Sequence, residues 1–169
     1  MDPEDAGEAP EARPPLLEDL VSLCRNLNHE NARFIVIGGM AVIQAGFGRA
    51  TNDIDLLIDI SAENQDKVRR ALMALPDQAI RDMAADDLEK YVVVRVADEI
   101  VVDLMRSACG IGHAEASEMT VEVEIDGVSI PFANARLLWR TKNTFRDKDK
   151  VDRAFLRSLL EAHGESVDG

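Results

Sequence analysis

Segments in which apolar residues recur at helical spacing alternate along the chain with short runs of β-branched and apolar residues. Leucines recur every three or four positions from Leu16 to Leu27, which predicts a first helix over about 16–30. Apolar runs at 33–37 and 53–60 predict two buried strands. A short helix over 40–45 is expected between them.

Four further strands are predicted in two hairpins. The first hairpin pairs 91–96 with 100–105 across a tight turn. The second pairs 120–125 with 128–132, and its two-residue turn Asp126–Gly127 is the clearest hairpin signal in the chain.

Polar residues mark the starts of later helices. Ser61 and Asn134 are predicted N-caps, because a side-chain oxygen can accept a free N–H of the first helical turn. The helix after Ser61 is expected to run through about residue 75. Two C-terminal helices are expected at about 134–162. The first holds Leu138, Thr141 and Phe145 on one side, and the second turns Val151, Phe155 and Leu159 inward.

This order of elements predicts one α+β domain over residues 16–163. Its sheet is expected to be mixed and mostly antiparallel, with helices packed largely on one face. A length of 169 residues, of which 46% are hydrophobic, fits one such domain. Residues 1–15 are acidic and rich in Pro and Ala, and are expected to form a disordered tail.

Composition narrows the expected partners and compartment. The net charge of −13 disfavours general nucleic-acid binding and binding to an anionic membrane. No apolar run approaches the roughly 18–20 residues that span a bilayer. Without a signal-peptide pattern or a CxxC pair, a cytoplasmic protein with free thiols is expected. The basic segment 136–157 can be a polyanion site or a solvated helix face of mixed charge.

Three aspartates interrupt apolar strands. Asp53 and Asp55 are two residues apart, so both side chains point to the same side of a strand. Such a pair repels unless the strand end is wet, an arginine such as Arg49 or Arg70 pairs with it, or a divalent cation binds. Asp103 interrupts a later apolar strand in the same way.

Together these three carboxylates can hold two Mg²⁺ ions, with Mn²⁺ as an alternative, because both metals prefer oxygen ligands. Two such ions can stabilise an in-line displacement at phosphorus. The cluster therefore makes phosphoryl or nucleotidyl transfer the leading chemistry.

Gly38 and Gly39 lie between a buried strand and a helix start. Glycine there lets the backbone approach a ligand, and the helix start offers free N–H groups to an anion. A tight strand-to-helix turn requires glycine even without a ligand, so this feature alone is weak evidence.

From about residue 33 to residue 157, the order of these features resembles the minimal nucleotidyltransferases of the DNA polymerase β-like superfamily. Within that superfamily, the chain is most similar to AbiEii-related and lincosamide- or kanamycin-nucleotidyltransferase-like proteins. The residues that carry the resemblance are Gly38, Gly39, Arg49, Thr51, Asp53, Ile54, Asp55 and Asp103. The resemblance implies the nucleotidyltransferase (polymerase β-like) fold and transfer of an NMP group from an NTP to a hydroxyl-type acceptor, releasing pyrophosphate.

The resemblance also implies roles for individual residues. Asp53 and Asp55 would bind both metal ions, and Asp103 would bind the catalytic one. Gly38 and Gly39 would hold the β- and γ-phosphates of the NTP. The second of these positions is often Ser in the family, so Gly39 keeps the backbone N–H and lacks a hydroxyl donor.

The C-terminal basic segment contains a second resemblance, to the R-x-K-D-x-x-D segment of AbiEii-related proteins. It implies that Lys142 or Lys148 reaches the triphosphate, while Asp149 and Asp152 hold these cations in place. Arg49 either contacts phosphate or orients the strand of Asp53, or is a surface residue.

The acceptor stays open among an antibiotic hydroxyl, a tRNA 3′ end and a protein side chain. A second copy of the chain or an antitoxin-type partner could complete the acceptor site. The alternative function is a non-catalytic NTP-binding or toxin–antitoxin interaction module that keeps the fold. The three acids argue against this alternative, because a module freed from catalysis need not retain costly buried charges.

Overall fold

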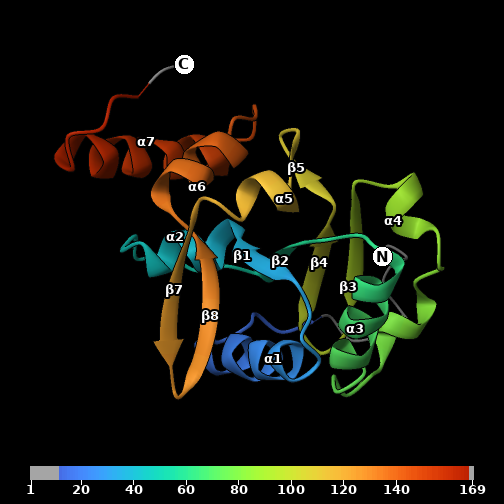
Figure 1. Ribbon diagram of the computed structural model, residues 1–169. Helices are drawn as coiled ribbons and strands as arrows, with labels where there is room; N and C mark the ends of the chain where they lie inside the picture. Colours follow the sequence, from blue (N-terminus) through green and yellow to red (C-terminus); the bar gives the residue numbers. More distant parts are fainter. Residues whose placement is uncertain (1–11, 168–169) are drawn as a thin grey trace, which may run out of the picture.

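The computed structural model describes residues 12–167, which form a six-stranded sheet with helices packed around it (Figure 1). The strand order is β3-β4-β2-β1-β8-β7. The strands are β1 (Phe34–Ile37), β2 (Asp53–Ile58), β3 (Val93–Ala97), β4 (Val101–Met105), β7 (Thr120–Ile125) and β8 (Val128–Ala133). Neighbours β1–β2, β3–β4 and β7–β8 are antiparallel, whereas β1–β8 and β2–β4 are parallel. The prediction of an α+β fold with a mixed, mostly antiparallel sheet is therefore confirmed.

Five helices follow the predicted order. They are α1 (Leu17–His29), α2 (Gly38–Gln44), α3 (Ala62–Leu72), α6 (Ala135–Thr141) and α7 (Asp147–Ala162). Both predicted N-caps are confirmed, since Ser61 Oγ accepts the Asn64 N–H at 3.3 Å and Asn134 Oδ1 accepts the Leu137 N–H at 2.8 Å. None of the helices within residues 12–167 is long and apolar enough to cross a membrane.

Several short elements were not predicted. They are the 3₁₀ helix η1 (Ala79–Asp82), α4 (Asp87–Lys90), the two-residue strands β5 (Ser107–Ala108) and β6 (Ile111–Gly112), and α5 (His113–Ala116). Segments of two to four residues contain too few apolar positions to show a period.

The buried face of the C-terminal helices differs from the prediction. Phe145 lies beyond the end of α6 and is 97% exposed, and Val151 on α7 is also exposed. The residues that α7 buries are Asp149, Asp152, Leu156 and Leu160. These four share one helical face, and half of them are acids, so the apolar period alone does not locate it. Phe155, also predicted to face inward, is partly buried and stacks on Phe47.

The N-terminal segment was predicted to be a tail as far as residue 15. Residues 1–11 lie outside the described part of the chain. Arg13, however, contacts the folded domain, because its guanidinium donates to Asp19 at 2.8 Å and to Glu99 at 2.7 Å. Arg13 is therefore held against α1 and the β3–β4 turn.

Strand directions bring the start of β2 close to the C-terminal helices. β1 is parallel to β8 and antiparallel to β2, so the first residues of β2 lie at the edge of the sheet where β8 ends. α6 begins directly after β8 and packs against α7 beyond this edge (Figure 1). This edge carries Asp53 and Asp55.

Asn64 ties α3 to the ends of β1 and β2. Its side chain is completely buried and makes three hydrogen bonds to the main chain. Oδ1 accepts the Arg33 N–H at 2.7 Å, while Nδ2 donates to the carbonyls of Arg33 at 2.9 Å and Asp59 at 2.7 Å. One amide thus satisfies three buried main-chain groups.

We expect Asn64→Ala to lower the free energy of unfolding by about 2–3 kcal/mol, because it leaves buried main-chain groups without partners. Urea denaturation followed by circular dichroism would measure this. Asn52→Ala, at an exposed position, is the matched control and should change stability by less than about 0.5 kcal/mol. Equal effects of the two substitutions would contradict the role of Asn64.

Candidate metal centre

Asp53, Asp55 and Asp103 converge on one side of the sheet. β2 and β4 are parallel neighbours, and their register places Asp55 directly opposite Asp103. Asp53 is two residues before Asp55 and therefore faces the same way. One carboxylate oxygen from each aspartate lies within 4.8 Å of the others, a spacing that a divalent cation can bridge.

The Asp55 carboxylate is the least satisfied of the three. Its Oδ1 is buried and accepts no hydrogen bond from any residue between 12 and 167. Burial, followed by repulsion from Asp53 and Asp103, raises the pKa of Asp55 to about 7. Lys142 and Lys148 act in the opposite direction without cancelling these effects. Without a bound cation, this carboxylate therefore keeps its proton to a higher pH than an ordinary aspartate does.

Gly38 provides the space for the Asp55 carboxylate. Its φ of +71° lies in the left-handed region that side chains disfavour, and a Cβ at this position would overlap Asp55 Oδ2. At Gly39 a Cβ would overlap the Thr51 hydroxyl instead. Gly38 thus packs directly against Asp55, and Gly39 packs against Thr51, which precedes the aspartate pair. This packing leaves no room for a side chain at position 39 while Thr51 keeps its place.

Arg95 on β3 is a site residue that the sequence did not reveal. It is the register partner of Asp103 on β4. Its guanidinium donates from Nε and Nη2 to both Asp103 oxygens at 2.9 Å, and Nη2 also lies 3.3 Å from Asp53 Oδ2. Arg49 and Arg70 were the expected partners of the aspartates. Arg70 instead pairs with Glu30 at 2.7 Å.

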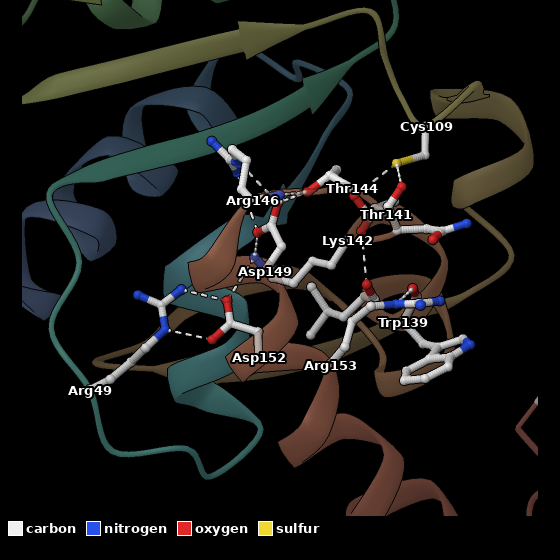
Figure 2. Close-up of polar contacts among 12 residues, drawn as sticks. Arg49, Cys109, Trp139, Thr141, Lys142, Thr144, Arg146, Asp149, Asp152 and Arg153 are labelled. Atoms are coloured by element: carbon white, nitrogen blue, oxygen red, sulfur yellow. Dashed lines mark hydrogen bonds and ion pairs between the residues drawn. The ribbon is translucent and has the colours of Figure 1, made fainter. Parts of the chain in front are cut away.

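Arg49 also contacts a different acid from the one expected. Its Nε and Nη2 each donate to Asp152 at 2.8 Å, although 103 residues separate the two in the chain (Figure 2). Lys142 Nζ lies 3.0 Å from the same carboxylate and 3.4 Å from Asp149. Because Asp149, Asp152 and Lys142 are all buried, this is an internal charge network rather than a solvated face.

Asp149 forms the second acidic position of this network. Burial raises its pKa, but hydrogen bonds from Arg146 and Thr144 and the charge of Lys142 hold the pKa below its ordinary value. Arg146 Nε donates to it at 2.9 Å. The two aspartates of α7 therefore hold basic residues in place, as the sequence pattern predicted.

The basic residues of the C-terminal segment separate into two groups. Lys142 and Lys148 lie near enough to Asp55 to lower its pKa. Arg153 instead stacks 3.7 Å from the centre of the buried Trp139 ring, on the side of Lys142 away from Arg49 (Figure 2). The two lysines therefore influence the aspartate cluster, whereas Arg153 lines a separate cavity of about 460 Å³.

Comparisons with solved structures agree with this architecture. The chain matches a candidate nucleotidyltransferase from Thermotoga maritima with a TM-score of 0.51 and 19% identity, over 86% of this chain and 92% of that one. It matches an antigenic nucleotidyltransferase-like protein from Paracoccidioides brasiliensis with a TM-score of 0.55 and 16% identity, over 90% and 78% of the respective chains. No protein-family profile and no curated protein sequence matches. The chain therefore has a nucleotidyltransferase-like fold.

The raised pKa of Asp55 predicts that stability falls as pH rises in the absence of metal. The folded protein keeps a proton at Asp55 up to about pH 7, whereas the unfolded chain releases it near the ordinary value of 3.8. Between these values the folded state binds more protons, so the free energy of unfolding decreases with increasing pH.

Asp55→Asn should remove this dependence and raise stability at pH 8 by about 2 kcal/mol or more. Urea denaturation at pH 5 and pH 8 in EDTA would measure the change. Asp66→Asn, on the exposed side of α3, should keep the wild-type pH profile. A wild-type profile in Asp55→Asn would show that this carboxyl is already ionised at low pH.

Proposed function

We propose that the protein is a metal-dependent nucleotidyltransferase, which transfers an NMP group from an NTP to a hydroxyl-type acceptor and releases pyrophosphate. The observation that carries the proposal is the convergence of three carboxylates around Asp55, whose buried oxygen lacks a hydrogen-bond donor among the described residues. Repulsion within this cluster destabilises the fold unless a cation offsets it. The nucleotidyltransferase-like fold supports the same reaction.

The donor set fits Mg²⁺ or Mn²⁺, since all three side chains offer oxygen and no His or Cys ligand within residues 12–167 joins them in the cluster. Asp53 and Asp55 would hold two ions and Asp103 one of them. When bound, these ions supply charge neutralisation at the phosphates and a lower pKa for the acceptor hydroxyl. Asp103 would receive the proton that this hydroxyl loses.

The remaining residues would bind the nucleotide. Main-chain N–H groups at Gly38 and Gly39, the first residues of α2, would face the β- and γ-phosphates. The missing side chains there leave room for Asp55 and Thr51. Lys148, which is exposed and influences Asp55, would offset the charge of the leaving pyrophosphate. Arg49 and Lys142 would act mainly through Asp152, by fixing the position of α7 beside the cluster.

The relation to AbiEii-related proteins in particular rests on the C-terminal segment with Lys148, Asp149 and Asp152. The buried ion pairs of both aspartates with Lys142 support a structural role for that segment in this chain. Candidate acceptors are an antibiotic hydroxyl, a tRNA 3′ end and a protein side chain. A second copy of the chain and an antitoxin-type partner are the candidates for completing the acceptor site.

Asp53→Asn and Asp103→Asn should each reduce Mg²⁺-dependent transfer on the order of 100-fold or more while the protein stays folded, since each removes a charged metal ligand. NTPs labelled at the α-phosphate, offered with tRNA, protein and aminoglycoside or lincosamide acceptors, would measure label transfer and pyrophosphate release. Asp126→Asn, in the exposed β7–β8 turn, is the matched control. Full activity in both site variants would refute the proposed function, and NTP binding without transfer to any acceptor would favour the non-catalytic module.

The two lysines should behave differently. Lys148→Ala should raise KM for the NTP by about tenfold with little loss of stability, because Lys148 is exposed. Lys142→Ala should instead lower the free energy of unfolding by about 3 kcal/mol or more, because it leaves Asp149 and Asp152 short of a buried cation. Steady-state kinetics and urea denaturation separate the two effects. Lys150→Ala, at an exposed position of α7, should change neither quantity.

A further inference from the structure

Arg95 occupies oxygens that the proposed metal centre needs. Its guanidinium pairs with both oxygens of Asp103 at 2.9 Å and with one oxygen of Asp53 at 3.3 Å. Asp55 Oδ1 receives no donor from Arg95 or from any other described residue. Arg95 is thus shared by two of the three carboxylates, and Oδ1 of the third accepts no hydrogen bond from the described residues.

The two partners in this contact differ in their exposure to solvent. The backbones of Arg95 and Asp103 are fixed opposite each other by the β3–β4 register. The Asp103 side chain is only 8% exposed, whereas the Arg95 side chain is 60% exposed. The guanidinium can therefore move into solvent while the aspartate cannot leave the cluster.

A guanidinium and a divalent cation compete at such a cluster for two reasons. They require the same carboxylate charge, and they repel each other at short distance in a partly buried site. Phosphate oxygens, in contrast, are strong bidentate partners for arginine. A triphosphate bound beside the cluster would offer the guanidinium a new set of acceptors.

We propose that Arg95 gates metal loading of this centre. Without nucleotide, Arg95 holds Asp53 and Asp103 and weakens the binding of a divalent cation. When a triphosphate binds, its oxygens draw the guanidinium away, so that metal and nucleotide bind cooperatively. This inference rests on the proposed function, and it makes Arg95 a positioning residue whose effect is on metal affinity.

The first test uses Mn²⁺ alone, with affinity measured by isothermal titration calorimetry in the absence of nucleotide. Arg95→Ala should bind Mn²⁺ on the order of tenfold more tightly than the wild type, since it removes the competing charge. Arg95→Lys should lie between the two, because lysine keeps the charge but not the planar fork. Arg70→Ala removes the same charge from a distant ion pair with Glu30 and should match the wild type.

The second test measures coupling. A non-hydrolysable NTP analogue should raise Mn²⁺ affinity in the wild type, and this enhancement should shrink about tenfold in Arg95→Ala, because coupling between two ligands is reciprocal. Circular dichroism confirms that each variant is folded. Arg95→Gln, which removes the charge but keeps the length of the side chain, replaces the alanine variant if that variant unfolds.

The outcomes separate this inference from the proposed function. Mn²⁺ binding that is abolished by Asp53→Asn but unchanged or weakened by Arg95→Ala would overturn the gate and leave the metal centre in place. Absence of any binding that depends on Asp53, in both the wild type and Arg95→Ala, would overturn both proposals. Tighter binding together with reduced coupling supports the gate.

Discussion

Mutual repulsion of three carboxylates is the constraint to which the surrounding structure responds. The parallel pairing of β2 with β4 fixes Asp55 opposite Asp103, so the fold cannot separate these charges without losing its central strand pair. Cations therefore surround the cluster on two sides, with Arg95 on β3 and Lys142 with Lys148 from the C-terminal segment. The negative charge of Asp55 is only partly compensated by these cations, so the cluster is suited to binding a further cation.

The C-terminal helices are part of the site and not an appendage to it. Asp152 of α7 binds Arg49, which precedes β2, and Lys142, which follows α6, so one buried carboxylate joins three segments distant in sequence. Burying an ion pair contributes little net stability compared with apolar packing, but loss of either partner is costly. Such a network fixes geometry more than it strengthens the fold. It holds α7 in one position relative to the start of β2.

Local sequence patterns were sufficient to predict that the three aspartates lie together. They did not predict the long-range contacts around these aspartates. The two-residue period placed Asp53 and Asp55 together, and an acid in an apolar strand identified Asp103. The pairing of Arg95 with Asp103 was not predicted. The predicted β3–β4 turn lay one residue too early, which moved the residue expected opposite Arg95 by two positions. The turn is set by Asp98, whose buried carboxylate accepts N–H groups of the preceding loop, including that of Ala79 at 2.8 Å. Sequence periodicity contains no information on such a contact.

Gly39 and Thr51 come from different segments of the chain and pack closely against each other. A side chain at position 39 and the threonine at position 51 compete for one volume. Homologous chains with serine in the glycine turn should therefore have a smaller residue, or a displaced strand approach, at the position equivalent to Thr51. The two positions should covary in an alignment, and a serine introduced at position 39 would fit best alongside a glycine at position 51.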